Sequence, residues 1–250
     1  MKEKGICYFC GKAAVSKEHV PPRSLYPNDD KFRHSLKKVP SCDEHNGKKS
    51  SLDNRMFTFL VGTSNNVNKK KELRSLRDKT IRAMKRDITL FNKITSDARV
   101  VKRKLGGLDL LTPGMENIEA LVDYNDHKNY QESILRGLYY HTFNMPFSKE
   151  IYIIPRAFIG FDADFDNIKS ILGIDEFEDK VKNNKCEMSG DYIFQHSVIY
   201  EGDLVIIHAC IYQEYFFHGI FCDKDLHSKI LNLFGDDCLT KKFNGFQPGS

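Results

Sequence analysis

Residues 7–25 read CYFCGKAAVSKEHVPPRSL and residues 39–49 read VPSCDEHNGKK, and these two stretches decide the fold of the 250-residue chain. Cys7 and Cys10 are spaced C-x2-C, and Cys42 and His45 have the same spacing. Each pair can turn two ligands toward one ion, and three thiolates with one imidazole form a usual structural zinc set. The spacing therefore predicts a zinc site that joins two distant segments. The alternative is that these cysteines are ordinary buried thiols.

Three residues near these pairs have the chemistry that phosphodiester hydrolysis requires. Glu18 and His19 are adjacent before a Pro-Pro loop, and Asn46 directly follows His45. An imidazole with a pKa near neutrality can take a proton from water. The oxygens of Glu18 and Asn46 suit a hard divalent cation, which would stabilise the charge that develops on the phosphate. His19 taken alone would be interpreted as a surface histidine in a loop.

Together the segments CYFCG, EHVPPRSLYP and VPSCDEHN resemble the HNH endonucleases of the ββα-metal fold. The similarity is to the zinc-bound subgroup with C-x2-C-G, then (D/E)-H-V-P-P-(K/R)-S-L, then V-P-x-C-x2-(C/H)-N. It covers residues 5–60. The resemblance implies that His19 is the general base, that Glu18 and Asn46 hold a catalytic Mg²⁺ or Mn²⁺, and that zinc is structural. The zinc ligands it implies are Cys7, Cys10, Cys42 and His45.

The chain departs from the family pattern at the middle asparagine. Ser35, beside His34, occupies that position and has a shorter reach for orienting the histidine. The second ligand pair also ends in histidine where many relatives have cysteine, which still gives a sound zinc set. Arg23 and Lys49 are candidate phosphate contacts, and a plain solvated charge is an equal interpretation for each.

Charge divides the chain unevenly. Residues 1–110 carry a net charge of +14 and residues 111–250 carry −10, which together give the overall +4. A basic half of this strength is typical of nucleic-acid binding. The cations of a predicted amphipathic helix add to it, although they could equally form a solvated face. These candidate contacts are Arg74, Arg77, Arg82, Lys85 and Arg86.

The resemblance and the apolar periodicity together predict an α+β fold with three parts. The resemblance implies a zinc-bound HNH nuclease module over 1–62. Periodicity and charge predict a basic helical connector over 63–110 and an acidic C-terminal domain with antiparallel strands over 111–250. The C-terminal domain is expected to regulate the nuclease, bind a protein partner or form a homodimer. The predicted helices are a helix from Ser50 or Ser51 that Gly62 and the stretch Thr63–Asn68 break, Lys69–Ser96 and Tyr130–Phe143. The predicted strands are Val100–Leu105, Ile151–Ile154 and three runs within 191–222, two of them joined at Glu201–Gly202.

The composition, 40% apolar and 29% charged, is globular. No apolar stretch approaches the ~20 residues of a membrane helix, and the first residues lack a signal core. We therefore expect a cytoplasmic protein without disulfides or membrane partners.

The sequence thus predicts a metal-dependent endonuclease acting on nucleic acid, with DNA favoured over RNA. Many HNH family members act in restriction or antiphage defence, so that role is an expectation from the resemblance. Two alternatives stay open. One is a zinc-bound nucleic-acid or partner-binding module with a decayed active site, and the other is an RNA-cleaving toxin nuclease.

Overall fold

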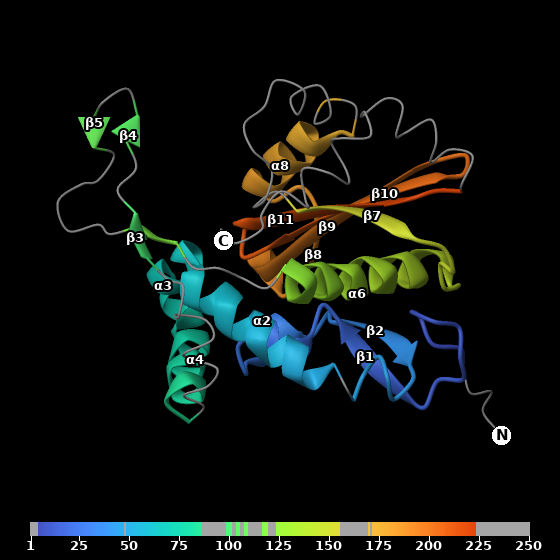
Figure 1. Ribbon diagram of the computed structural model, residues 1–250, viewed down its shortest axis with the longest axis horizontal. Helices are drawn as coiled ribbons and strands as arrows, with labels where there is room; N and C mark the ends of the chain where they lie inside the picture. The colour runs from blue at the N-terminus through green and yellow to red at the C-terminus, as the bar shows by residue number, and fades with distance from the viewer. Residues whose placement is uncertain are drawn as a thin grey trace, which may run out of the picture.

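The protein is a mixed α+β structure in which one central helix lies between two sheets (Figure 1). This computed structural model describes residues 5–47, 49–86, 99–101, 104–105, 108–109, 117–119, 124–155, 170 and 172–223. In Figure 1, helix α8 lies above a five-stranded sheet, α6 lies below that sheet, and the N-terminal strands lie below α6. The predicted α+β class is confirmed.

The larger sheet is antiparallel throughout and has the order β7-β11-β10-β9-β8. Gly202, with φ of +57°, lies in the turn between β9 and β10, where the sequence predicts a hairpin. The central strand β10 is buried along nearly its whole length, as its sequence LVIIHACI implies. The strands are β7 (Ile151–Pro155), β8 (Glu187–Ser189), β9 (Phe194–Glu201), β10 (Leu204–Ile211) and β11 (Tyr215–Phe221).

Helix α6 (Tyr124–Phe143) packs against both sheets. On one side, Leu135 lies against Gly219 of β11, and on the other, Gly137 lies against Val20 of the N-terminal hairpin. Arg136 is also buried, and its guanidinium donates to the carbonyl oxygens of Phe147 and Lys149. The helix begins six residues before the predicted start. Its first turns carry few apolar side chains, so apolar periodicity could not reveal them.

The N-terminal module has a β-hairpin followed by a helix. The inner face of the hairpin is buried toward α2 and α6. This face carries Glu18, Val20 and Val39. Arg55 of α2 forms a bidentate ion pair with Asp126 of α6, at 2.6 and 2.7 Å. The elements are β1 (Ser16–Val20), η1 (Arg23–Leu25), α1 (Asp30–Arg33), β2 (Lys37–Ser41) and α2 (Ser50–Thr63), and β1 pairs antiparallel with β2.

Three sequence predictions for residues 50–96 need correction. Helix α2 starts at Ser50 as predicted, but it continues through Gly62. The segment expected to be a break forms α3 (Asn65–Lys69), capped by Ser64. The predicted continuous helix is interrupted at Lys70, whose backbone is extended, and resumes through η2 (Lys71–Leu73) as α4 (Arg74–Arg86). Residues 87–98 of that prediction lie outside the described residues.

Tertiary contacts explain the interruption. The Lys70 ammonium lies 3.3 Å from the ring centroid of Tyr192 and donates to Gln213. At the start of α3, the backbone N–H of Asn66 donates to Glu214 at 2.9 Å. Helical periodicity reports local preference only, so it could not reveal these contacts with residues more than a hundred positions away.

Several short elements complete the structure. Helix α8 (Ile174–Lys182) covers the outer face of the large sheet and was not predicted from the sequence. Near the predicted strand at Val100–Leu105, β3 pairs with β6 and β4 with β5. The additional elements are η4 (Asp191–Ile193), β3 (Arg99–Val101), β4 (Lys104–Leu105), β5 (Leu108–Asp109) and β6 (Asn117–Glu119).

The contact between α6 and the hairpin yields a stability prediction. A Cβ at Gly137 would lie 2.5 Å from Cγ2 of Val20, so Gly137→Ala should force the helix and the hairpin apart. We expect a loss of about 1–3 kcal/mol in the free energy of unfolding, measured by urea denaturation. Helix propensity alone would instead make alanine stabilising by about 1 kcal/mol.

Gly62→Ala is the matched control, because a Cβ there would meet only Met84 at an ordinary 3.7 Å. The control should be neutral or stabilising. If Gly137→Ala behaved like Gly62→Ala, α6 would not be in close contact with the hairpin.

Candidate metal centre and active site

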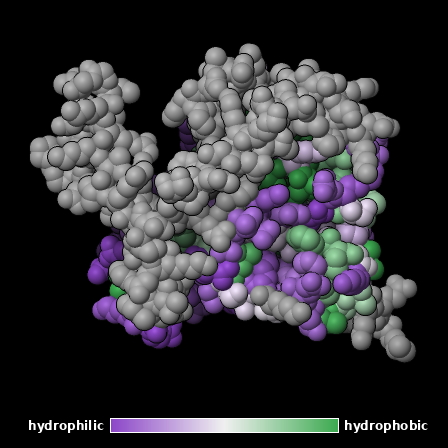
Figure 2. Space-filling view, viewed as in Figure 1, coloured by the Kyte–Doolittle hydropathy of each residue, from purple (hydrophilic) through white to green (hydrophobic). Residues whose placement is uncertain are grey.

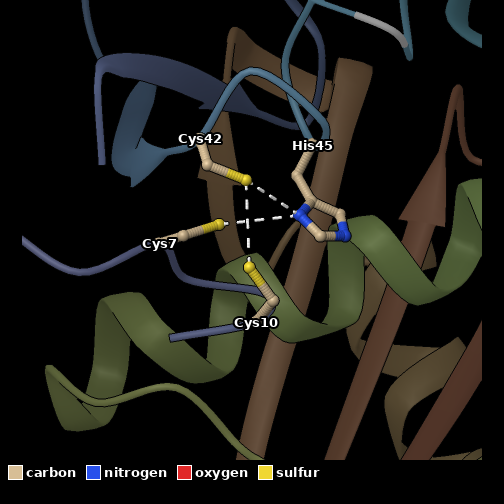
Figure 3. Close-up of side chains that lie close together, drawn as sticks. All are labelled: Cys7, Cys10, Cys42 and His45. Atoms are coloured by element: carbon tan, nitrogen blue, oxygen red, sulfur yellow. Dashed lines mark hydrogen bonds between the residues drawn. The ribbon is translucent and has the colours of Figure 1, made fainter. Parts of the chain in front are cut away.

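Cys7, Cys10, Cys42 and His45 converge on one point (Figure 3). The first two come from the N-terminal turn, and the others come from the turn between β2 and α2. Their ligand atoms all lie within 4.8 Å of one another. Spacing alone predicted this cluster, and the structure brings together all four residues.

Three separations between ligand atoms are close to those of a tetrahedral zinc site. With Zn–S bonds of about 2.3 Å and Zn–N bonds of about 2.0–2.1 Å, tetrahedral edges are about 3.8 Å for S···S and 3.5 Å for S···N. The Sγ atoms of Cys10 and Cys42 are 3.8 Å apart. Nδ1 of His45 lies 3.8 Å from Sγ of Cys7 and 3.2 Å from Sγ of Cys42. The cluster can therefore hold a zinc ion through three sulfurs and Nδ1.

The surroundings orient the ligands. The ring of Phe9 stacks on His45 at a centroid distance of 4.2 Å, and the Arg136 guanidinium lies over Phe9 at 4.9 Å. Burial raises the pKa of the Cys7 thiol, but backbone hydrogen bonds at Cys10, Cys42 and Phe9 outweigh it, so that the pKa is lowered. Such hydrogen bonds stabilise the thiolate form that binds metal.

The turn that carries His45 also holds Asn46 beside β1. The Asn46 backbone N–H donates to the Cys42 carbonyl at 3.1 Å, and its Nδ2 donates to Oγ of Ser16 at 2.8 Å. Ser16 and Glu18 share one face of β1 because side chains alternate along a strand. The candidate cation ligands Glu18 and Asn46 are thus on the same side of the hairpin.

Glu18 is enclosed in a buried group of charges. It is 6% exposed, and its Oε1 forms an ion pair with Nζ of Lys49, a contact that the sequence did not reveal. Lys49 also lies 3.7 Å from Oδ1 of Asp53. Burial raises the pKa of Asp53 to about 6. Burial, and then the charge of Glu18, raise the pKa of Tyr8 well above its usual range. Lys49 therefore contacts a carboxylate here, although the sequence proposed it as a phosphate contact.

His19 lies on the opposite face of β1, directly across from Lys38 of β2. Burial lowers its pKa, and the positive charges of Lys38, Arg23 and Arg33 lower it further. A neutral imidazole surrounded by cations is suited to accept a proton near a bound phosphate. Arg33 and Lys38 were not predicted from the sequence, where their only signal is the general excess of basic residues.

The remaining candidates lie elsewhere. Ser35 is exposed in the turn between α1 and β2. Arg74, Arg82, Lys85 and Arg86 are exposed on α4, and Arg77 is half-buried. Figure 2 shows hydrophilic residues gathered where α4 lies, at the lower left.

No protein-family model matches the sequence, and no curated protein or solved structure is similar enough to count as a match. Among the helices in the described part of the chain, none has the length and apolar character to cross a membrane.

The ligand geometry predicts one zinc per chain in protein purified without chelators, measured by plasma mass spectrometry. Cys42→Ser should lose the metal and lower the free energy of unfolding by several kcal/mol, because metal binding and folding are coupled. Cys186→Ser is the matched control, since Cys186 is a half-buried thiol outside the cluster. Full zinc content in Cys42→Ser would remove Cys42 from the ligand set.

Proposed function

We propose that the chain is a metal-dependent endonuclease of the HNH type that hydrolyses phosphodiester bonds, in DNA more readily than in RNA. One observation carries the proposal: the Cys3His cluster holds Asn46 beside the strand that bears Glu18 and His19. This joins the three motif segments in one place although they are far apart in the sequence.

The open edge of β1 is where a phosphate would bind. Among the described residues, β1 pairs with β2 alone, so no strand in this part of the chain pairs with its other edge. A phosphate at that edge would lie beside His19 on the outer face, with the buried Glu18 on the inner face of the same strand. Arg23, Arg33 and Lys38 would then bind its oxygens, because guanidinium and ammonium groups donate several hydrogen bonds to phosphate.

His19 would act as the general base. Its lowered pKa keeps the imidazole neutral near pH 7, so that it can accept the proton of an attacking water. The bond between phosphorus and the leaving oxygen breaks as the bond to the water oxygen forms, and the leaving oxygen takes a proton from solvent to become a hydroxyl. The resemblance implies products with 5′-phosphate and 3′-hydroxyl ends.

The residues present fit a catalytic Mg²⁺ or Mn²⁺. Oε2 of Glu18 is buried without a hydrogen-bond partner, and Asn46 uses its Nδ2, not its Oδ1, to bond Ser16. These two oxygens would hold the ion, which prefers oxygen ligands. Bound there, it would supply positive charge to stabilise the negative charge that develops during cleavage.

A second function has some specific support. Glu18 is paired with Lys49, and Ser35 is exposed where the family has an asparagine. Both features suit a zinc-bound module that binds nucleic acid or a protein without cleaving. An RNA-directed toxin nuclease would use the same residues as a DNA nuclease, so it differs from the first proposal only in substrate. A defence role and a partner-binding or dimerising C-terminal region remain proposals.

Cleavage assays separate these functions. Zinc-loaded protein with Mg²⁺ or Mn²⁺ should cut plasmid or linear DNA, and His19→Ala should slow cleavage by about 10²–10⁴-fold. The variant should keep its zinc content and its affinity for DNA. Substrates should include RNA and single-stranded DNA. If wild-type protein bound nucleic acid but cut none of these substrates, the binding module would replace the nuclease.

The salt dependence of DNA binding tests the phosphate contacts. Arg23→Gln combined with Lys38→Gln should reduce the slope of log K against log salt by about 2, because each contact with duplex DNA contributes about 0.9. The proposed DNA contacts of α4 are tested by the same salt slope, in a variant that combines Arg77→Gln, Arg82→Gln and Lys85→Gln.

The matched control is the pair Lys180→Gln and Lys182→Gln on α8, on the far side of the large sheet. Its slope should equal that of the wild type. An unchanged slope for Arg23 and Lys38 would place the DNA away from the His19 face.

A further inference from the structure

The ammonium of Lys49 is almost completely enclosed. Its side chain is 9% exposed, and the side chains of its partners Glu18 and Asp53 are 7% and 21% exposed. A buried charge is costly unless it is paired, so these three groups must balance one another. With two carboxylates and one ammonium, the group has one negative charge in excess when all three are ionised.

The two carboxylates share the single cation unequally. Lys49 contacts Oε1 of Glu18, whereas it stands 3.7 Å from Oδ1 of Asp53, beyond hydrogen-bond distance. Oε2 of Glu18 and Oδ1 of Asp53 are both buried without a hydrogen-bond partner of good geometry, and the buried Tyr8 hydroxyl lies close to Glu18. The group therefore has acceptor oxygens that a second positive charge could satisfy.

Lys49 can move between its two partners without a change in the backbone. It is the N-cap of α2 with helical dihedral angles, so Asp53 lies one turn further along the same helix. Residues i and i+4 are neighbours on a helix surface, and this spacing is a usual one for ion pairs. A shift of about 1 Å by the ammonium would bring it within hydrogen-bond distance of Asp53.

We propose that Lys49 is a built-in cation that holds the Glu18 carboxylate while no divalent metal is bound, and that it transfers to Asp53 when the metal arrives. This inference rests on the proposed function, since it assumes that Glu18 is a metal ligand. Lys49 is then a positioning residue. It keeps the buried carboxylate paired in the metal-free protein, and it competes with the metal for Glu18.

The transfer makes the roles of Lys49 and Asp53 interdependent. In the wild type, Asp53 aids metal binding by accepting the displaced ammonium. When residue 49 is neutral, there is no ammonium to accept, and Asp53 contributes only its distant charge. If Lys49 only repelled the metal, Asp53 would change the metal affinity by the same factor whether residue 49 was lysine or neutral.

The test is a double-mutant cycle on the affinity of the zinc-loaded protein for Mn²⁺, measured by electron paramagnetic resonance of the free ion. Lys49→Gln, which can still donate a hydrogen bond to Glu18, should bind Mn²⁺ at least about tenfold more tightly than wild type. Asp53→Asn should weaken binding by about fivefold in the wild type and much less in the Lys49→Gln background. Lys12→Gln is the matched control, an exposed lysine paired with Glu44, and it should change nothing.

Two results would overturn the proposal. One is unchanged or weaker Mn²⁺ binding in Lys49→Gln, and the other is an equal effect of Asp53→Asn in both backgrounds. Glu18→Gln separates this failure from failure of the catalytic site. If it abolishes Mn²⁺ binding while the cycle shows no coupling, the metal site stands and the transfer is wrong. If it leaves binding unchanged, Glu18 is not a ligand and both ideas fall.

A crystal structure of the wild type with Mn²⁺ gives a readout that does not depend on the variants folding. Nζ of Lys49 should lie closer to the Asp53 carboxylate than to that of Glu18. An ammonium that remained on Glu18 with Mn²⁺ bound would contradict the transfer.

Discussion

The architecture depends on helix α6 packing against two sheets at once. Where the helix meets β1 and β11, a glycine stands on one side of each contact, Gly137 against Val20 and Gly219 against Leu135. The missing side chains allow a close approach that any Cβ would prevent. Helix α6 also carries Arg136, whose guanidinium lies over Phe9, and Phe9 stacks on His45 of the Cys3His cluster. Helix α6 is thus connected to the cluster through these two side chains. The large sheet therefore packs against the helix that contacts the cluster, and it provides none of the proposed ligands.

The hairpin divides the chemistry of the candidate site between its two faces. The inner face, covered by α2 and α6, holds Glu18 among buried charges, and the outer face holds His19 among cations. Burial favours strong, defined pairing on the inner side, whereas the partly exposed outer side remains open to a polyanion. One strand thus has a buried, charge-paired face and a partly exposed, cationic face.

Sequence reasoning succeeded where a local pattern carries the information. The spacing of Cys7, Cys10, Cys42 and His45 predicted the cluster, and apolar runs predicted β9, β10 and β11. It failed where distant residues decide. The pairing of Lys49 with Glu18 joins residues 31 positions apart, and the break at Lys70 depends on Tyr192 and Gln213. The roles of His19 and Asn46 rest on motif order, so they remain predictions.

The N-terminal module shares its core with residues near the other end of the chain. Tyr212 donates its hydroxyl proton to the carbonyl of Leu25, and Gly190 packs directly on the ring of Tyr26. At ribosomal rates of about 5–20 residues per second, these partners emerge roughly six to thirty seconds after the module itself. A nascent chain therefore carries unsatisfied aromatic surface on the module during that interval. These contacts can complete the packing of the module only after residues 190–212 have left the ribosome.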